Sequence, residues 1–389
     1  MRLFAMCLFF FLVSISCRKV IINSQDYTYS TPLEIQDGLH VGSLAAVGLD
    51  SLLLAQMTKS IVDEDIYNIH SVLIYKNGLL VYERYLCGLD EKHGKKLGLV
   101  RHRLDCLHDA RSVSKSVVSA CVGIALQKGL IKTVDEPVLG YFPDICKKDK
   151  LNPHKMQITV RNMLTMSSGL SWHELGKYGQ LLNDETKMDL SLNPIKFVLK
   201  QEMASIPGTD WNYSGGNTQV LAEIVRRQSG LDIHTFARKF LFEPLGIQES
   251  EWVCLTLDKS PAAASGLRLR SRDLLKLGVL YLNSGVFNGQ QILDADWVEE
   301  SLASHKQRPS LEQLNIEDGG YGYQFWTYKR AFKGKNLDIV EAKGNGGQSI
   351  YICKTLNLVL VTTGGNYGQT SSNGNVSRIL SQFVLPACQ

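Results

Sequence analysis

The stretch Ser112-Val113-Ser114-Lys115 decides how the rest of this sequence is interpreted, because it places a hydroxyl and an amine three residues apart at the start of a helical segment. In a helix, residues i and i+3 are neighbours on one face. A serine in the first turn also lies beside the free amides and the positive end of the helix dipole. A lysine there can help the hydroxyl to ionise, which a bare serine does not do near neutral pH. The pattern therefore indicates a nucleophilic Ser112 with Lys115 as its partner.

A Ser-x-x-Lys pattern is weak by itself, since a helix-capping serine followed by a solvated lysine produces it as well. The pattern recurs at Ser16 to Lys19, which lies beside an apolar leader. Ser112 differs in its context, because residues 117–125 are mostly apolar and continue the helical pattern. The context favours the nucleophile, and further segments are needed to decide.

Two such segments follow. Residues 206–217 run from Pro207-Gly208 through Tyr213 into a helix, and Lys343-Gly344-Asn345-Gly346-Gly347-Gln348 precedes an apolar strand. With Ser112 these are, in order and spacing, the three elements of the penicillin-recognising serine hydrolases. The sequence resembles the serine β-lactamase-like and penicillin-binding-protein-like family of class C type. Within it, the sequence most resembles the 6-aminohexanoate-dimer hydrolase-like and esterase-like members, over about Tyr67 to Ser381.

The resemblance implies a role for each motif residue. Ser112 takes the place of the acylated nucleophile, while Lys115 and Tyr213 share the proton transfer, with the base left as a joint assignment. Tyr213 could instead be a partly buried aromatic at the start of a helix. No cofactor is expected.

The glycine-rich segment would supply the oxyanion hole. We expect one donor from the amide of Ser112 and one from an amide between Gly346 and Gln348. The expected oxyanion and substrate-binding residues are Asn345, Gly346, Gly347, Gln348 and Asn217. The alternative is that these glycines only turn the chain into the next strand.

The sequence departs from the family pattern at two positions. Gly215 stands where the second motif, Tyr-x-Asn, has its asparagine, and Gly344 or Asn345 stands where the third motif has a lysine or histidine. That cation meets the substrate carboxylate in β-lactamases and peptidases. Lys343 is offset by one residue and should face the other side of its strand. We therefore expect poor recognition of β-lactams.

The expected fold is α+β and β-lactamase-like: an antiparallel sheet formed by both chain ends, flanked by helices, with a mainly helical subdomain inserted at 131–240. A hairpin is predicted over residues 72–82, because Asn77-Gly78 separates two apolar runs. Helices are predicted over 49–61, 112–130, 220–228 and 376–384, and two C-terminal strands over 349–353 and 358–363. We divide the chain into residues 1–16, a leader and helix at 17–60, and a catalytic domain at 61–389.

The first sixteen residues predict export. Leu3 to Ser16 is apolar and uncharged, too short for the roughly 20 residues that span a bilayer but typical of a signal peptide. Ser14-Ile15-Ser16-Cys17 resembles the lipobox of bacterial lipoproteins, although Ser14 replaces the usual leucine. We expect a periplasmic protein or a lipoprotein anchored to the membrane at Cys17, with plain signal cleavage as the alternative.

Composition excludes other classes. The chain has 389 residues, 44% of them hydrophobic, as in an ordinary globular protein. Its 42 basic and 38 acidic residues leave a net charge of +4 without a basic stripe, so nucleic acid is not an expected partner.

A disulfide between Cys87 and Cys106 is possible in an oxidising compartment.

Most other polar candidates are interpreted as structural. His70, His102, His108 and His173 lack ligand spacing, so no metal is expected. Trp172, His173 and Tyr178 could line the mouth of the pocket or belong to core or surface. Glu174 could be a solvated helix residue.

The expected function is hydrolysis of small esters or amides through a Ser112 acyl-enzyme. The alternatives are a catalytically weak penicillin-binding or sensor protein of the same fold, and a β-lactamase. The loops at 88–110 and 170–200 would set the width of the pocket.

Overall fold

The computed structural model describes residues 28–145, 152–174, 180–312 and 317–388. The expected signal peptide, Cys17 and Tyr178 lie outside these residues.

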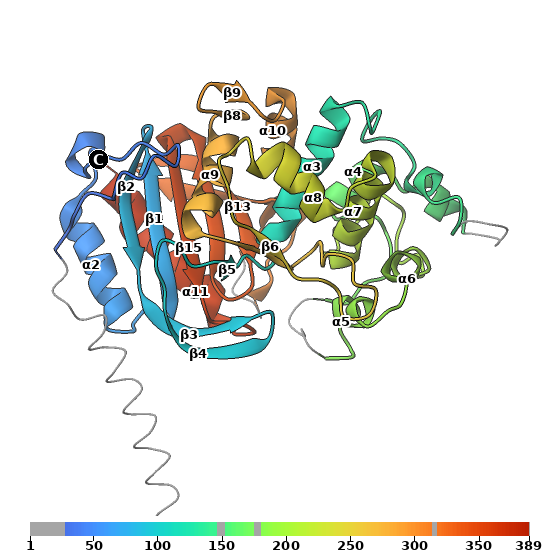
Figure 1. Cartoon of the computed structure of the whole chain (residues 1–389), viewed down its shortest axis with the longest axis horizontal. Coiled ribbons are helices and arrows are strands. Elements are labelled where there is room, and N and C mark those ends of the chain that lie inside the picture. Colours follow the sequence, from blue (N-terminus) through green and yellow to red (C-terminus); the bar gives the residue numbers. More distant parts are fainter. Residues whose placement is uncertain (1–27, 146–151, 175–179, 313–316, 389) are drawn as a thin grey trace, which may run out of the picture.

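The core of the molecule is an eight-stranded antiparallel sheet in the order β10-β11-β12-β13-β14-β15-β1-β2. Both chain ends contribute to it, since the N-terminal strand β1 pairs with the C-terminal strand β15 (Figure 1). This confirms the α+β prediction. The strands are β1 (Ile69–Lys76), β2 (Leu79–Tyr85), β10 (Lys306–Arg308), β11 (Gly319–Tyr321), β12 (Trp326–Phe332), β13 (Lys335–Gly344), β14 (Gln348–Cys353) and β15 (Leu358–Gly364).

The predicted N-terminal hairpin is confirmed as β1 and β2. Asn77 and Gly78 both have positive φ angles, 51° and 89°, which a two-residue turn of this kind requires. Neighbouring residues of β1 enter different apolar clusters, with Val72 and Ile74 in one and Leu73 and Tyr75 in the other. Both faces of the sheet are therefore covered.

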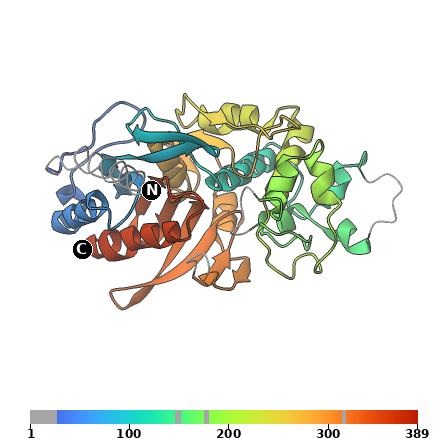
Figure 2. The same ribbon diagram turned by 90° about the horizontal axis from the view of Figure 1, so that it is seen from below.

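Helices cover the two faces. On one face, α9 (Ser271–Leu282) packs against β14, β15 and β1. On the other lie α2 (Ser51–Val62) and the C-terminal segment of α11 (Ser371–Arg378), the π-helical turn Ile379–Val384 and α12 (Leu385–Ala387), side by side in Figure 2. The helices predicted at 49–61 and 376–384 are thus present.

Helices fill the region between α3 and β6, as the sequence predicts. Its described residues contain α4 (Val160–Leu164), α5 (Asp184–Asp189), α6 (Pro194–Leu199), α7 (Gly215–Ser229) and α8 (Ile233–Ala237), with short 3-10 and π turns. They gather beside one end of the sheet in Figure 1. The long helix α3 (Val113–Gln127) packs against both α7 and β13, and so joins the helical region to the sheet.

Smaller strands complete the fold near the start of α3. The hairpin of β3 (Cys87–Lys92) and β4 (Lys95–Arg101) lies along the lower edge of the sheet in Figure 1. A three-stranded sheet joins β5 (His108–Asp109), β7 (Leu267–Leu269) and β6 (Glu251–Trp252). The remaining elements are β8 (Val286–Phe287), β9 (Gln290–Gln291) and α10 (Ala295–Leu302).

Cysteine placement corrects one expectation. No disulfide joins Cys87 to Cys106, and Cys87 is buried in β3. Cys121 and Cys353 are buried core residues.

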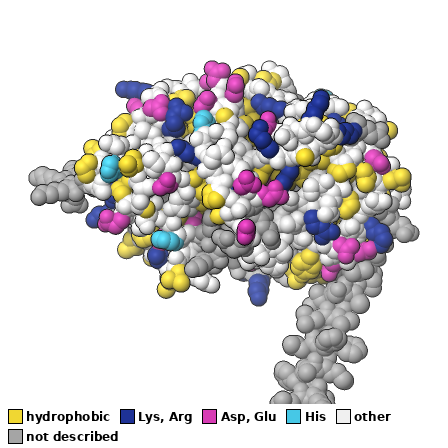
Figure 3. All heavy atoms as spheres, turned by 180° about the vertical axis from the view of Figure 1, so that it is seen from behind, with side chains coloured by type: hydrophobic (Ala, Val, Ile, Leu, Met, Phe, Trp, Pro, Cys, Tyr) yellow, Lys and Arg dark blue, Asp and Glu magenta, His cyan; other side chains and the backbone are white. Residues whose placement is uncertain are grey.

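The surface offers no membrane-spanning element in the described part of the chain, where no helix is both long enough and apolar enough to cross a bilayer. On the face that Figure 3 shows, acidic and basic side chains are interspersed.

Candidate active site

Ser112 lies at the turn between β5 and α3, where the backbone is strained. Arg111, directly before it, has a φ of 49°, which a non-glycine side chain rarely adopts. Ion pairs from Arg111 to Glu91 and Asp109 hold this conformation. Ser112 itself is the N-cap of α3, and its side chain makes no capping hydrogen bond. The turn thus presents a half-buried hydroxyl beside the helix N-terminus, and the capping explanation does not hold.

Lys115 points back at Ser112, as the helix spacing predicts. Its Nζ donates to Ser112 Oγ at 3.1 Å and to the carbonyl oxygen of Ala264 at 3.2 Å. The ammonium is buried, with a side chain only 1% exposed. Burial alone would lower the pKa of Lys115, but the charges of Tyr213 and Glu174 raise it above its ordinary value. Lys115 is therefore a charged donor to the serine in the resting protein.

Tyr213 completes the predicted group of three. It lies just before α7, buried, and its hydroxyl is in hydrogen-bond contact with both Ser112 and Lys115. The Lys115 Nζ also lies 4.8 Å from the centre of the Tyr213 ring. Burial raises the pKa of Tyr213, whereas the Lys115 ammonium opposes the rise. The structure thus brings Ser112, Lys115 and Tyr213 together.

Glu174 is a site residue that the sequence analysis misjudged. It is 3% exposed and not solvated, and its Oε1 lies 3.6 Å from Lys115 Nζ. Its Oε2 accepts from the indole of Trp172 at 2.7 Å and from the amide of Gly215. No spacing rule links residue 174 to residue 115, so only the tertiary structure reveals the contact.

Glu185, from α5, forms a carboxyl pair with Glu174. Burial raises the pKa of Glu174 to about 8, and the neighbouring Glu185 adds to the rise. Burial also favours the protonated form of Glu185, but Lys115 and hydrogen bonds from Glu174 and Ser265 outweigh it and lower its pKa. Near neutral pH the two carboxyl groups therefore share one proton and carry one negative charge beside Lys115.

The carboxyl pair explains why glycine occupies position 215. A Cβ there would lie 3.1 Å from Glu174 Oε2 and 3.1 Å from the carboxyl carbon of Glu185. The two carboxyl groups therefore occupy the space that an asparagine side chain would need. Where the family pattern has the asparagine side chain, this protein has the carboxyl groups of Glu174 and Glu185.

Two cavities open on either side of this group. One, of about 390 Å³, is lined by Ser112, Glu185, Asn345 and Tyr367 and by the turn of the β3–β4 hairpin. The other, of about 490 Å³, is lined by Tyr213, Glu174, Trp172 and His173, so the last two do border a pocket. A larger cavity of about 520 Å³ near Arg272 contains no hydroxyl or thiol side chain. Of these three cavities, the first adjoins Ser112 and the second adjoins Tyr213.

The glycine-rich segment lies at the end of β13. Gly346 and Gly347 have φ angles of 100° and 103°, which favour glycine, and Asn345 lines the Ser112 cavity. A Cβ at Gly344 would lie 2.4 Å from the carbonyl oxygen of Ala110, so no side chain fits at that position. Lys343 does not replace the missing cation, because its Nζ lies 3.0 Å from Glu341 Oε2, over the ring of Tyr328.

Two of the expected oxyanion and substrate-binding residues, Asn217 and Gln348, have buried side chains. Asn217 is fully buried in α7, where its Oδ1 accepts from Ser168 Oγ at 3.0 Å. Gln348 is also fully buried, and its side chain bonds both backbone groups of Gly364, at 2.6 and 3.1 Å. These two side chains are therefore engaged within the protein and do not reach the Ser112 cavity. Asn217 bonds Ser168, and Gln348 bonds the backbone of β15. The glycine-rich segment can therefore offer its backbone amides to a substrate.

The histidines correct a premise of the sequence analysis. His70, His102 and His108 lack ligand spacing, but the fold brings them together around Asp90. His173 lies apart from them, 80% exposed. Residue spacing carries no signal for this cluster, because its members come from different elements.

Comparison with known proteins agrees with this geometry. The chain is 24% identical over 269 residues to the 6-aminohexanoate-dimer hydrolase of Paenarthrobacter ureafaciens, a match that covers 66% of each chain. It is 28% identical over 208 residues to the lovastatin esterase of Penicillium rubens, and so spans about half the length of that relative, 48%. The solved structure of EstCE1, a hydrolase with promiscuous acyltransferase activity, superposes with a TM-score of 0.66 at 14% identity, over 84% of this chain and 97% of that one. The Beta-lactamase family model matches residues 69–370, and this chain therefore belongs to the beta-lactamase family of serine hydrolases.

Proposed function

We propose that the protein hydrolyses small esters or amides through an acyl-enzyme on Ser112. The observation that carries the proposal is the 3.1 Å hydrogen bond from Lys115 Nζ to Ser112 Oγ, with Tyr213 in contact with both and a cavity of about 390 Å³ in front of the serine. The names of the relatives, one a 6-aminohexanoate-dimer hydrolase and one a lovastatin esterase, support this substrate class.

The reactive form in the proposed reaction is the one in which the Lys115–Tyr213 pair has first released one proton to solvent. Ser112 Oγ then attacks the substrate carbonyl carbon, and its proton passes to the vacant site on that pair. The negative charge on the carbonyl oxygen is stabilised by the amide of Ser112 and an amide between Gly346 and Gln348. The pair then returns the proton to the leaving alcohol or amine. Water attacks the acyl-enzyme by the same route and regenerates Ser112.

The charges around the cavity bear on the substrate. Glu91, Glu185 and Asp189 line it together with Arg111, and Arg111 is already paired with Glu91. A neutral or cationic acyl group meets less repulsion there than a carboxylate does. The proposed substrates are therefore uncharged or amine-bearing esters and amides of modest size.

The deciding experiment is labelling by a serine-reactive fluorophosphonate, followed by intact-mass measurement. We expect one adduct on the wild type and none on Ser112→Ala, together with a fall in p-nitrophenyl butyrate turnover on the order of 10³-fold or more. Ser119→Ala is a matched control, since Ser119 is buried in the same helix and its hydroxyl has no hydrogen-bond partner. An adduct of equal yield on Ser112→Ala, or no adduct on the wild type, would identify a catalytically silent binding protein instead.

A screen of short p-nitrophenyl esters against small amides and amino-acid oligomers then separates esterase from amidase. An ester requires only the nucleophile, the base and the oxyanion hole, while an amide also requires protonation of a poor leaving group.

A further inference from the structure

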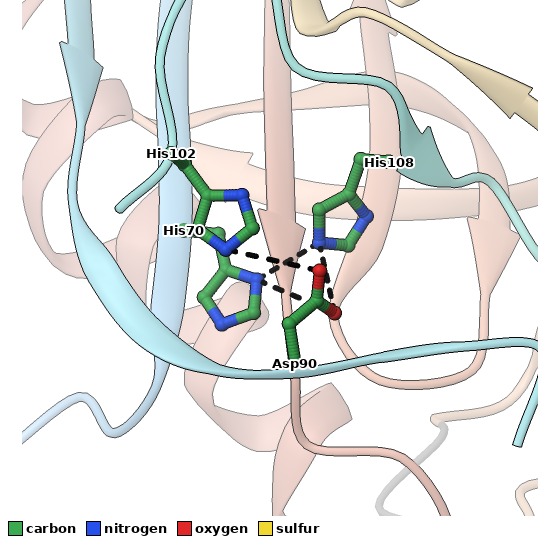
Figure 4. A group of neighbouring side chains, drawn as sticks. All are labelled: His70, Asp90, His102 and His108. Carbon is green, nitrogen blue, oxygen red and sulfur yellow. Dashed lines mark hydrogen bonds and ion pairs between the residues drawn. The ribbon is translucent and has the colours of Figure 1, made fainter. Parts of the chain in front are cut away.

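Four buried side chains from four places in the chain converge outside the candidate active site (Figure 4). His70 lies on β1, Asp90 on β3 and His108 on β5, and His102 follows β4. They are 0%, 7%, 2% and 6% exposed, respectively. One donor atom from each lies within 4.8 Å of all the others, an arrangement found once among the residues that the structure describes.

The distances suit a small four-coordinate ion. The Asp90 oxygens lie 3.9 Å from His70 Nδ1, 3.7 Å from His108 Nε2 and 3.9 Å from His102 Nε2. His70 Nδ1 and His108 Nε2 are 2.8 Å apart. Tetrahedral zinc, with bonds of about 2.0–2.1 Å, needs donor atoms roughly 3.3 Å apart. These separations bracket that value, and none among the four donor atoms exceeds 4.8 Å, so side-chain shifts of about an ångström would complete the geometry.

Hydrogen bonds on the outer side of two rings fix their tautomers. The amide of Asn68 is oriented by two bonds to the backbone of Leu89, so the atom that faces His70 Nε2 at 3.3 Å is its oxygen. His108 Nδ1 likewise faces the carbonyl oxygen of Asp109 at 3.1 Å. Since oxygens of this kind only accept, both outer nitrogens carry the protons. Metal-bound histidines show the same outer bonds to carbonyl oxygens.

The inner nitrogens of these two rings consequently both present lone pairs, across 2.8 Å. Two lone pairs at this distance repel each other unless a cation lies between them. A shared proton would satisfy this one contact, at the cost of burying an imidazolium. It would leave His102 Nε2, which is buried without a hydrogen-bond partner and directed at Asp90, unsatisfied. A metal ion satisfies all three rings together.

Asp90 is also held as metal-bound carboxylates are. Its Oδ1 accepts from the hydroxyl of Tyr367 at 3.0 Å and from the amide of Glu91 at 2.8 Å. Tyr367 and Glu91 both line the Ser112 cavity. The cluster therefore connects strand β1 of the main sheet to the hairpin that forms one wall of that cavity.

We propose that His70, Asp90, His102 and His108 form a binding site for a divalent transition metal of the zinc type. Three imidazoles and one carboxylate suit zinc, and they suit calcium or magnesium poorly. Four protein ligands leave no open position, which is the arrangement of a structural site and not of a catalytic one. The ion fastens the β3–β4 hairpin to β1 and keeps the wall of the pocket in place.

The test is metal analysis of the full chain. Protein treated with a chelator and then dialysed against zinc chloride should hold about one zinc per chain by mass spectrometry, and cobalt substitution should give the visible bands of a four-coordinate ion. Zinc should raise the melting temperature of the treated protein by mass action. His102→Ala should lose zinc affinity by about tenfold or more, and His40→Ala, which changes an exposed histidine outside the cluster, should not.

His102→Phe preserves the ring volume and keeps the test valid if the alanine variant folds poorly. We expect it to melt as the chelator-treated wild type does and to gain nothing from added zinc. Absence of zinc and cobalt binding by the wild type would overturn the proposal and leave a proton-sharing histidine cluster. Stoichiometric binding that survives both His102 substitutions would also overturn it, because the ion would then lie elsewhere.

Discussion

At the scale of single residues, the site is defined by charge balance around Lys115. A buried ammonium is costly unless it is paired, and the Glu174–Glu185 pair supplies one negative charge beside it. The one shared proton matters, because two ionised carboxylates would hold Lys115 more firmly in its charged state. The pair thus sets how readily Lys115 and Tyr213 can exchange a proton with Ser112.

This arrangement predicts a pH dependence of stability. The pKa of Glu174 in the folded protein, about 8, lies above its ordinary value of 4.5, so its contribution is fully present below pH 4.5 and is lost as the pH rises through 8. The pKa of Glu185 is lowered, so its contribution to stability is present above its ordinary value of 4.5 and is lost only as the pH falls through its lowered pKa. Urea unfolding between pH 5 and 9 should show the wild type losing stability with pH, and Glu174→Gln, which cannot ionise, losing less. Parallel curves for the two proteins would contradict the assignment.

At the scale of elements, close approach between helix and sheet is set by glycine. A Cβ at Gly278 in α9 would lie 2.6 Å from Val359 and 2.7 Å from Ile350, side chains of β15 and β14. Gly374 in α11 has no atom within 4 Å of the same position. Both glycines lie in helices, but only the one in α9 lies against the sheet, with no room for a methyl group.

Alanine substitution should separate the two cases. Gly278→Ala should destabilise the fold by about 1–3 kcal/mol, because overpacking outweighs the gain in helix propensity. Gly374→Ala should be neutral or stabilise by up to about 1 kcal/mol. Chemical denaturation measures both, and a stable Gly278→Ala would mean that α9 does not pack as closely as described.

The absence of a cation at the end of β13 predicts slow turnover of β-lactams. Gly344 leaves no room for a side chain, and Lys343 is paired with Glu341 on the other side of the strand. A charge-assisted bond to a substrate carboxylate, worth about 1.5–3 kcal/mol, is therefore missing. Its loss corresponds to roughly one to two powers of ten in rate.

We accordingly expect penicillin and nitrocefin turnover well below that of p-nitrophenyl butyrate on the same preparation. Lys343→Ala should leave the turnover of penicillin and of nitrocefin, each relative to the ester, unchanged, because the lysine does not face the cavity. Penicillin turnover that exceeds the ester rate and disappears in Lys343→Ala would show that this lysine reaches the substrate.

At the scale of the whole molecule, the expectation concerns where the protein acts. The apolar run Leu3 to Ser16 followed by Cys17 supports the proposal that the chain is exported and anchored by a lipid at Cys17. Membrane fractionation of the wild type and of Cys17→Ser should show the wild type in the membrane and the variant released. Equal solubility of both would contradict the anchor, and an unprocessed cytosolic chain would contradict export as well.

Local spacing along the chain is enough to predict several features of this protein. Helix geometry alone predicts that Lys115 meets Ser112, and the turn preference of Asn77-Gly78 predicts the β1–β2 hairpin. Tyr213 could be placed with them because its motif has a known order along the chain. These relationships can be predicted from the sequence, since they involve residues close in the chain or fixed motif positions.

The tertiary structure decided everything that depends on contacts between distant segments. Glu174 lies beside Lys115, Asn217 turns inward to Ser168, and His70, His102 and His108 surround Asp90 only because separate elements pack together. Burial then changes their chemistry, since a carboxyl or imidazole removed from water must find a partner or shift its protonation. Residue spacing carries no record of such contacts, so the carboxyl pair and the metal-like cluster could not be read from the sequence.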